Sequence, residues 1–164
     1  GAEVWRQGID GTAVTNGDLA YDVAVDSAGD VVAVGVLDNA GTDEDLTVVK
    51  LDGVSGAEVS RLSVDGPGMR DEAFTVAVDA AGDAMVGGRI QNGFAVLKVD
   101  GALGAELWRY TLPSPISVRH VRRRGKARCR HEQSGTAWTL QGQGGTLGFG
   151  GLSGSVGPRR STPA

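Results

Sequence analysis

The sequence predicts an all-β chain built from repeated four-stranded antiparallel units. Two segments, Ala20–Gly35 and Ala73–Gly88, align without a gap at an offset of 53 residues. Two further segments, Val48–Val59 and Val96–Leu107, align at an offset of 48 residues. Apolar residues alternate with small or polar ones in both copies, which is the period of a β-strand, and 27 glycines interrupt the windows that a helix would need. A repeat of about 50 residues with strand content is typical of sheet arrays.

Each repeat is expected to contain four strands joined by short turns. The first turn is Asp26–Asp30 in one copy and Asp79–Asp83 in the other, where Asp can accept backbone hydrogen bonds and Gly can adopt a positive φ. An Asp-Gly-x-x-Gly turn joins the third and fourth strands of each copy. The expected strands are Ala20–Val25, Val31–Val36, Leu46–Leu51 and Ala57–Val64 in the first copy, and Ala73–Val78, Ala84–Gly88, Phe94–Val99 and Ala105–Leu112 in the second.

Four short antiparallel strands in about 50 residues are the plan of a β-propeller blade. We therefore expect blades at residues 18–64 and 71–112. Residues 1–9, GAEVWRQGI, match the fourth-strand motif and are expected to be the last strand of a preceding blade. A closed propeller has about four to eight blades. The chain is thus expected to be a fragment of a larger propeller, with open blade faces that make it marginally stable or self-associating.

Residues 113–164 break the repeat and change the charge. Residues 1–112 contain 7 Lys and Arg against 19 Asp and Glu, whereas residues 113–164 contain 9 against the single Glu132. We expect this basic, glycine-rich tail to be of low complexity and disordered. Reading the bases of an Asp-Ala-Ala-Gly motif one position earlier gives Arg-Arg-Arg-Gly, which is the sequence of Arg122–Gly125. A third blade frameshifted after Leu112 is therefore a hypothesis that the coding DNA tests.

Two phrases resemble known bacterial propeller repeats. The segment Lys98–Tyr110, KVDGALGAELWRY, resembles the Leu-Asp-x-x-x-Gly-x-x-x-Trp-Arg segment of pyrroloquinoline-quinone (PQQ) repeats, and VAVDAAGD is similar to the SBBP repeats. The resemblance implies a propeller in an extracellular, cell-surface or periplasmic protein. In quinoprotein repeats the Trp of each blade docks on the neighbouring blade. Trp5 and Trp108 match that position, and Ser60 occupies it in the middle copy. No quinone or metal ligand of that family can be placed on this sequence, so no cofactor is implied.

A cluster of basic residues follows the repeats and suggests phosphate binding, because clustered cations gain free energy by releasing counterions from nucleic acid. The only aromatic residues near it that can stack on bases are Trp138 and Phe149, so nucleic-acid binding is not favoured and stays an alternative. The cluster comprises Arg119, Arg122, Arg123, Arg124, Lys126, Arg128 and Arg130.

Other motifs are weaker. His120, Cys129 and His131 suggest metal ligands or a Cys-His nucleophile pair, but a second paired ligand set is missing. The acidic segment Asp38–Asp45 lacks the spacing of a Ca²⁺ loop and is expected to be a solvated loop. Turn chemistry explains the hairpin carboxylates Asp26, Asp30, Asp79 and Asp83. The glycine-rich residues 141–158 lack the Gly-Lys-Ser/Thr of a phosphate-binding loop. No catalytic, cofactor-binding or metal-binding residue is predicted.

The sequence favours a non-enzymatic propeller-repeat scaffold or interaction module. Its expected partners are further blades of a parent protein, a second copy held through open blade faces, or a protein or glycan. A fragment of a PQQ-dependent dehydrogenase and nucleic-acid binding through the basic tail are the alternatives. The single cysteine, Cys129, excludes an intramolecular disulfide, and no apolar run is long enough to span a membrane.

Overall fold

The computed structural model describes residues 1–14, 17–66, 70–112, 116–122, 126–131, 137–143 and 146–150, and from residue 116 onward it describes only strands and their pairing. All secondary structure in these residues is β-strand. The strands are β1 (Leu19–Val25), β2 (Val31–Asn39), β3 (Asp43–Leu51), β4 (Glu58–Val64), β5 (Glu72–Val78), β6 (Ala84–Ile90), β7 (Gly93–Val99), β8 (Glu106–Leu112), β9 (Ile116–Arg122), β10 (Lys126–His131), β11 (Ala137–Gln143) and β12 (Thr146–Gly150).

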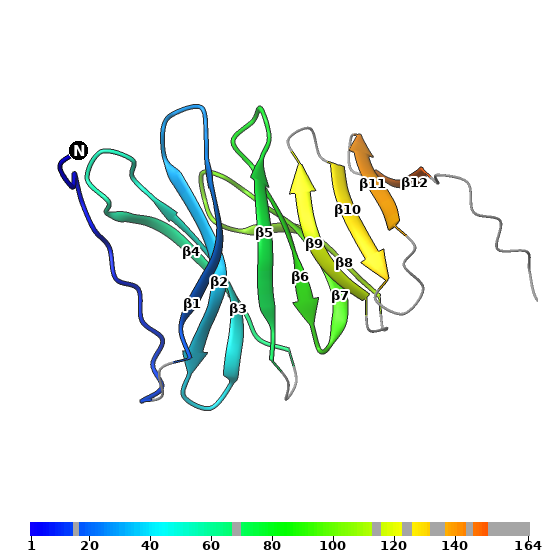
Figure 1. Cartoon of the computed structure of the whole chain (residues 1–164), viewed down its shortest axis with the longest axis horizontal. Helices are drawn as coiled ribbons and strands as arrows, with labels where there is room; N and C mark the ends of the chain where they lie inside the picture. The colour runs from blue at the N-terminus through cyan, green and yellow to red at the C-terminus, as the bar shows by residue number, and fades with distance from the viewer. Residues whose placement is uncertain are drawn as a thin grey trace, which may run out of the picture.

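The strands form three four-stranded sheets that stand side by side (Figure 1). The first sheet holds β1 to β4, the second β5 to β8 and the third β9 to β12, each in sequence order with antiparallel neighbours. β5 lies against β1, β2 and β3, and β9 lies against β5, β6 and β7. The predicted all-β fold with two four-stranded antiparallel sheets, one for each sequence repeat, is confirmed.

The two repeats agree in detail, because the same turns produce the same geometry. Asp26 N donates to Asp30 O at 3.0 Å in the first hairpin, and Asp79 N donates to Asp83 O at 2.9 Å in the second. The hairpin glycine has a φ of +94° in one copy and +90° in the other, a region that side chains resist. β1 and β5 also carry a register shift at equivalent positions. The sequence repeat is therefore a structural repeat.

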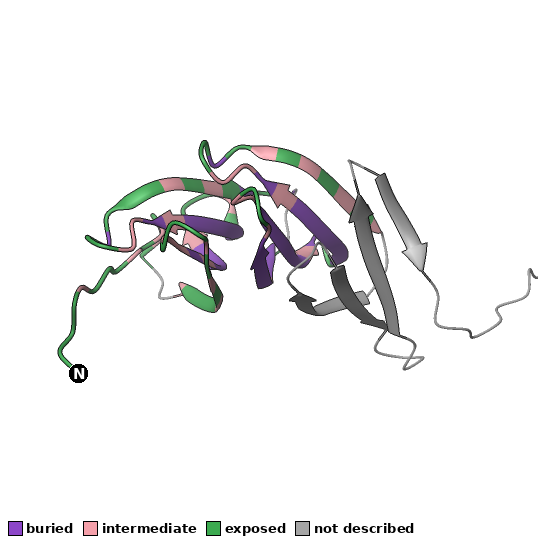
Figure 2. Cartoon of the chain, turned by 90° about the horizontal axis from the view of Figure 1, so that it is seen from above, coloured by how far each residue is buried: buried purple, intermediate pink, exposed green. Residues whose placement is uncertain are grey.

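An apolar core fills the space between the first and second sheets. Leu46, Val86 and Leu97 are fully buried there, and removal of this apolar surface from water is the main favourable term. Figure 2 shows buried residues gathered in the central strands, while β8 and β4, except for its buried last residue Val64, are exposed or intermediate. The buried members are Val32, Val34, Leu46, Val48, Val64, Ala73, Val76, Val78, Ala84, Val86, Ile90, Ala95, Leu97 and Val99.

A second core lies on the other face of the second sheet, toward β9. Its buried members are Ala77, Met85, Phe94 and Val96. The fourth strand, β8, contributes partly buried aromatic and aliphatic side chains, among them Trp108. Both faces of the second sheet are thus apolar.

The chain beyond Leu112 differs from the expectation of a disordered tail. Between Ile116 and Gly150 four strands pair into the third sheet. The sequence of this stretch contains a period-two alternation, for example in Ile116-Ser-Val118, which is compatible with a strand. Residues 151–164, which include the end of the glycine-rich segment, lie outside the described residues.

Residues 1–9 also differ from expectation. They were predicted to be the last strand of a preceding blade, but they form no strand, and the first element is β1. A strand is defined by hydrogen bonds to a neighbour, and the fourth-strand motif alone does not supply that neighbour. The segment passes beside the first sheet (Figure 1), with Trp5 on the turn between β3 and β4 and Ile9 against one face of the sheet.

Candidate functional site

The richest polar site lies where the first sheet meets the second, at the end that carries the Asp26–Asp30 hairpin. Lys50, on β3, places its Nζ 2.9 Å from Asp26 Oδ2 and 3.2 Å from Asp30 Oδ2. The same Nζ donates to the backbone oxygen of Gly101, on the second sheet, at 2.9 Å. A Lys ammonium has three N–H donors, so these three partners satisfy it. Lys50 therefore joins its own hairpin to the neighbouring sheet.

The second sheet repeats the arrangement. Lys98 Nζ lies 3.1 Å from Asp79 Oδ2 and 2.8 Å from Asp83 Oδ2. Asp79 Oδ1 accepts hydrogen bonds from Ala81 N and Asp83 N, as Asp26 Oδ1 does from Ala28 N and Asp30 N. The hairpin carboxylates thus serve the turn, as predicted, and in addition each hairpin binds a lysine from the third strand of its own sheet.

The ion pairs shift the pKa values of their members. The hydrogen bond from Lys50 lowers the pKa of Asp26, and that from Lys98 lowers the pKa of Asp83. The bond to Asp26 raises the pKa of Lys50 in turn, and the bond to Asp83 raises the pKa of Lys98. All four groups are therefore charged at neutral pH, which suits a structural clamp. A general acid or base would instead need a pKa near the working pH.

Trp5 makes the contact that the family resemblance implies. Its Nε1 donates to the backbone oxygen of Gly53 at 3.1 Å, in the turn between β3 and β4. Gly56 has a φ of +73°, and a Cβ added there would lie 2.7 Å from Cδ2 and Cε3 of the indole. The ring therefore rests directly on the glycine backbone. Residues 1–9 are held on the first sheet through this contact although they are not a strand.

Polar contacts also join the sheets along β1 and β5. Asp22 Oδ2 accepts hydrogen bonds from Thr75 Oγ1 at 3.1 Å and from Val76 N at 2.9 Å. The hydroxyl of Tyr21 donates to Glu72 Oε1 at 3.3 Å, and its ring meets that of Phe74 edge to face with centroids 5.6 Å apart. Burial and the nearby Glu72 carboxylate raise the pKa of Tyr21. These contacts fix the position of the second sheet relative to the first.

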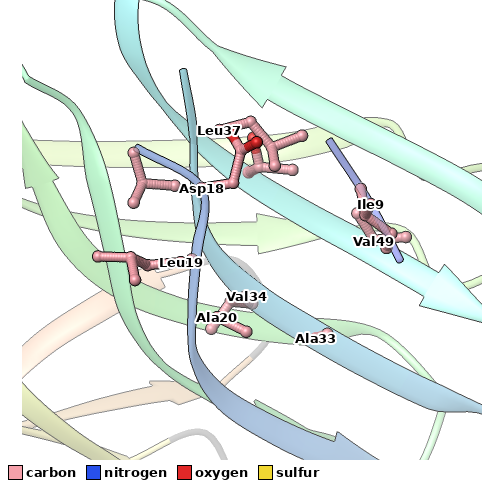
Figure 3. Close-up of a pocket in the computed structure, with 11 residues that line it drawn as sticks. Ile9, Asp18, Leu19, Ala20, Ala33, Val34, Leu37 and Val49 are labelled. Atoms are coloured by element: carbon pink, nitrogen blue, oxygen red, sulfur yellow. The ribbon is translucent and has the colours of Figure 1, made fainter. Parts of the chain in front are cut away.

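The face of the first sheet that points away from the second sheet is apolar and partly open, and is called the open face below. A shallow pocket of about 110 Å³ lies on it beside Ile9, with Ala33, Leu37, Thr47 and Val49 in its lining (Figure 3). On the same sheet Val23 is 60% exposed and Val25 is 51% exposed. Their repeat equivalents Val76 and Val78, 53 residues later, are only 5% and 7% exposed because they face the first sheet. The open face therefore presents the residue types that are buried at the junction of the two sheets.

The acidic segment Asp38–Asp45 is not the solvated loop that we expected. β2 extends to Asn39 and β3 begins at Asp43, and both Glu44 and Asp45 are buried. Asp45 Oδ2 accepts hydrogen bonds from Asn39 Nδ2 at 2.7 Å and Thr42 Oγ1 at 3.1 Å, and Glu44 forms an ion pair with Arg70. The carboxylates therefore organise a hairpin and its contact with the chain before β5.

The histidines and the cysteine lie on two paired strands of the third sheet. His120 is in β9 opposite Arg128 of β10, while Cys129 and His131 are both in β10, opposite Val118 and Ile116. The backbone register thus places none of the three opposite another. Arg119, Arg122, Lys126, Arg128 and Arg130 are likewise in β9 and β10, whereas Arg123 and Arg124 lie outside the described residues.

Within the part of the chain that the structure describes, no group of three or more His, Cys, Asp or Glu side chains is arranged to hold a metal ion. The same residues contain no helix that is long and apolar enough to cross a membrane.

Comparisons with known proteins add little to this description. No family model matches the chain, and no curated protein sequence matches it. Among solved structures, the crystal structure of BamB from Moraxella catarrhalis matches with a TM-score of 0.36 and 14% sequence identity. The match covers 75% of this chain and 58% of the BamB chain, so the chain spans less than two thirds of that protein. A likeness of this size assigns neither a family nor a function.

Proposed function

We propose that the chain is a non-enzymatic propeller-repeat module of the SBBP or PQQ-like kind, which works by docking a further blade of the same repeat type. One observation carries the proposal. The open face of the first sheet matches, position by position, the face of the second sheet that is buried against the first. Val23 and Val25 on the open face are the repeat equivalents of Val76 and Val78, which are buried against the first sheet. The contact between the first and second sheets is thus the pattern on which the proposed docking is based.

The energetics support docking at this face. Full burial of a fully exposed valine side chain contributes roughly 1.5–3 kcal/mol. Val23 is 60% and Val25 is 51% exposed, so a sheet that covers them gains about half of that for each and offsets part of the entropy lost on association. The surroundings differ from those of a catalytic cleft, because the conspicuous charged groups are engaged in clamps such as that of Lys50 with Asp26 and Asp30. The proposed role is accordingly that of a scaffold, with other specificity carried by loops.

Sedimentation velocity tests the docking. At increasing concentration the wild-type chain should associate, since a second copy supplies further blades. Val23→Asp places a charge on the open face and should suppress association. Leu107→Asp is the matched control, because Leu107 is 49% exposed in β8 of the second sheet and is not part of the open face. A wild-type chain that stays monomeric throughout, or equal suppression by both variants, would contradict docking through this face.

Titration with PQQ and Ca²⁺ tests the non-enzymatic part separately. The proposal expects no retained quinone absorbance after gel filtration. A stoichiometric bound signal would favour the alternative of a dehydrogenase fragment, whatever the sedimentation result.

A further inference from the structure

The chain holds two copies of one turn, and a neighbouring segment contacts each copy in a different way. The turns are Asp52–Gly56 in the first sheet and Asp100–Gly104 in the second, which are equivalent at an offset of 48 residues. In both, the Asp backbone accepts from the last residue and the Asp side chain bonds the turn. The backbone oxygen of the second residue, Gly53 or Gly101, points outward to a donor from elsewhere in the chain.

At the first turn a single side chain contacts both the carbonyl of the second residue and the glycine that ends the turn. The indole N–H of Trp5 donates to Gly53 O at 3.1 Å, and the indole ring covers Gly56. At the second turn the residue in the Trp position is Ser60, which is too short to reach the carbonyl while covering the glycine. A Cβ added at Gly104 would lie 2.7 Å from Ser60 Cβ, so Ser60 stands over the glycine as the indole does over Gly56.

The hydrogen-bond donor at the second turn comes from β3, the strand next to β4, which carries Ser60. Lys50 is directly opposite Ser60 in the pairing of β3 with β4, and its Nζ donates to Gly101 O at 2.9 Å. A small crevice of about 10 Å³ remains between the sheets at this place, lined by Lys50, Ser60, Gly101 and Gly104 among others. The serine therefore leaves unfilled space beside the lysine.

We propose that Lys50 and Ser60 together replace, at the second turn, the tryptophan that contacts the first turn: Ser60 covers Gly104, and Lys50 supplies the hydrogen bond to the Gly101 carbonyl. The carbonyl accepts one hydrogen bond from the neighbour, either from an indole N–H or from an ammonium group. Lys50 can play this part because Asp26 and Asp30 hold its ammonium group in place from the opposite side. The inference concerns a contact within the chain, so it stands or fails independently of docking at the open face.

The test combines Lys50→Met, Ser60→Trp and the double variant in the full chain. Lys98→Met is the matched control, because Lys98 pairs with Asp79 and Asp83 in the same way within the second sheet. Two readouts are needed: the midpoint of urea unfolding, and the ¹³C resonance of the Gly101 carbonyl, which reports its hydrogen bond. Ser60→Phe adds a ring without an N–H donor.

We expect Lys50→Met to move the Gly101 carbonyl resonance and Lys98→Met to leave it in place. Ser60→Trp alone should raise the urea midpoint. In the double variant it should bring the Gly101 carbonyl resonance back toward its wild-type position and reduce the midpoint loss caused by Lys50→Met by about half or more. Ser60→Phe should raise the midpoint without returning the resonance.

Three outcomes would overturn the inference. They are an unchanged Gly101 resonance in Lys50→Met, midpoint losses that simply add in the double variant, and aromatic variants at position 60 that lower the midpoint or do not fold. The last outcome would show that the second turn cannot accept a ring where the first one does.

Discussion

Replacing Val76 by alanine should destabilise the chain strongly, whereas the same change at its repeat equivalent Val23 should not. Val76 is 5% exposed and lies in the core between the first two sheets. Val→Ala removes two buried methyl groups at about 0.8 kcal/mol each, and the cavity left behind raises the expected loss to about 2 kcal/mol. Val23 is 60% exposed, so its loss should stay within about 0.5 kcal/mol.

Urea unfolding of the dilute chain measures both variants. With a slope of about 2 kcal/mol per molar, Val76→Ala should lower the midpoint by about 1 M at an unchanged slope, and Val23→Ala should leave it nearly in place. Equal effects of the two variants would refute the reasoning, because the repeat-equivalent positions would then be equally buried. A Val76→Ala midpoint equal to that of wild type would refute the described core itself.

Three further outcomes are expected. The Asp26–Lys50 pair should make stability depend on pH at both extremes. The pKa of Asp26 is lowered from 3.8, so its contribution to the stability of the fold should be lost as the pH falls below that value. The pKa of Lys50 is raised from 10.5, so its contribution to stability should be lost as the pH rises above that value. Urea midpoints against pH check this, and Asp26→Asn should flatten the acid limb. Gly56→Ala should cost more than Gly29→Ala, about 2 against about 1 kcal/mol, because both have positive φ but only Gly56 meets an indole ring. Tryptophan emission should shift to the red only in Gly56→Ala, and equal emission in the two variants would contradict the docked indole. Asp22→Ala should cost about 1–2 kcal/mol by removing two hydrogen bonds to β5, and an unchanged thermal midpoint would argue against those bonds.

Features set by neighbouring residues could be predicted from the sequence. The hairpins at Asp26–Asp30 and Asp79–Asp83 follow from local turn chemistry, and the offset of 53 residues between them carries over to the geometry. The lysine clamps were missed, although a signal was present. Lys50 and Lys98 occupy the same place in the two aligned segments, and a lysine repeated together with two carboxylates suggests an ion pair.

Features set by distant residues were not accessible in this way. Glu44 is buried because Arg70, 26 positions later, pairs with its carboxylate. The third sheet was missed for a related reason. The second sheet has a second apolar face around Phe94 that lies toward β9, and this requirement for a covering layer is visible only once the sheets are assembled. Residues 1–9 show that a local motif alone does not make a strand, because they carry the fourth-strand motif but have no paired neighbour.

The junction of the first two sheets joins two different surfaces: Val34 and Val48 come from one face of a sheet, and Val86 and Leu97 come from the opposite face of the next. Such a contact is heterologous. A copy whose outer sheet docked on the open face in this way would therefore not form a twofold-symmetric dimer, because the two surfaces in contact differ and each added copy keeps an open face of its own. Growth would end only where the rotation per copy closes a cyclic oligomer, and would otherwise continue as an open filament.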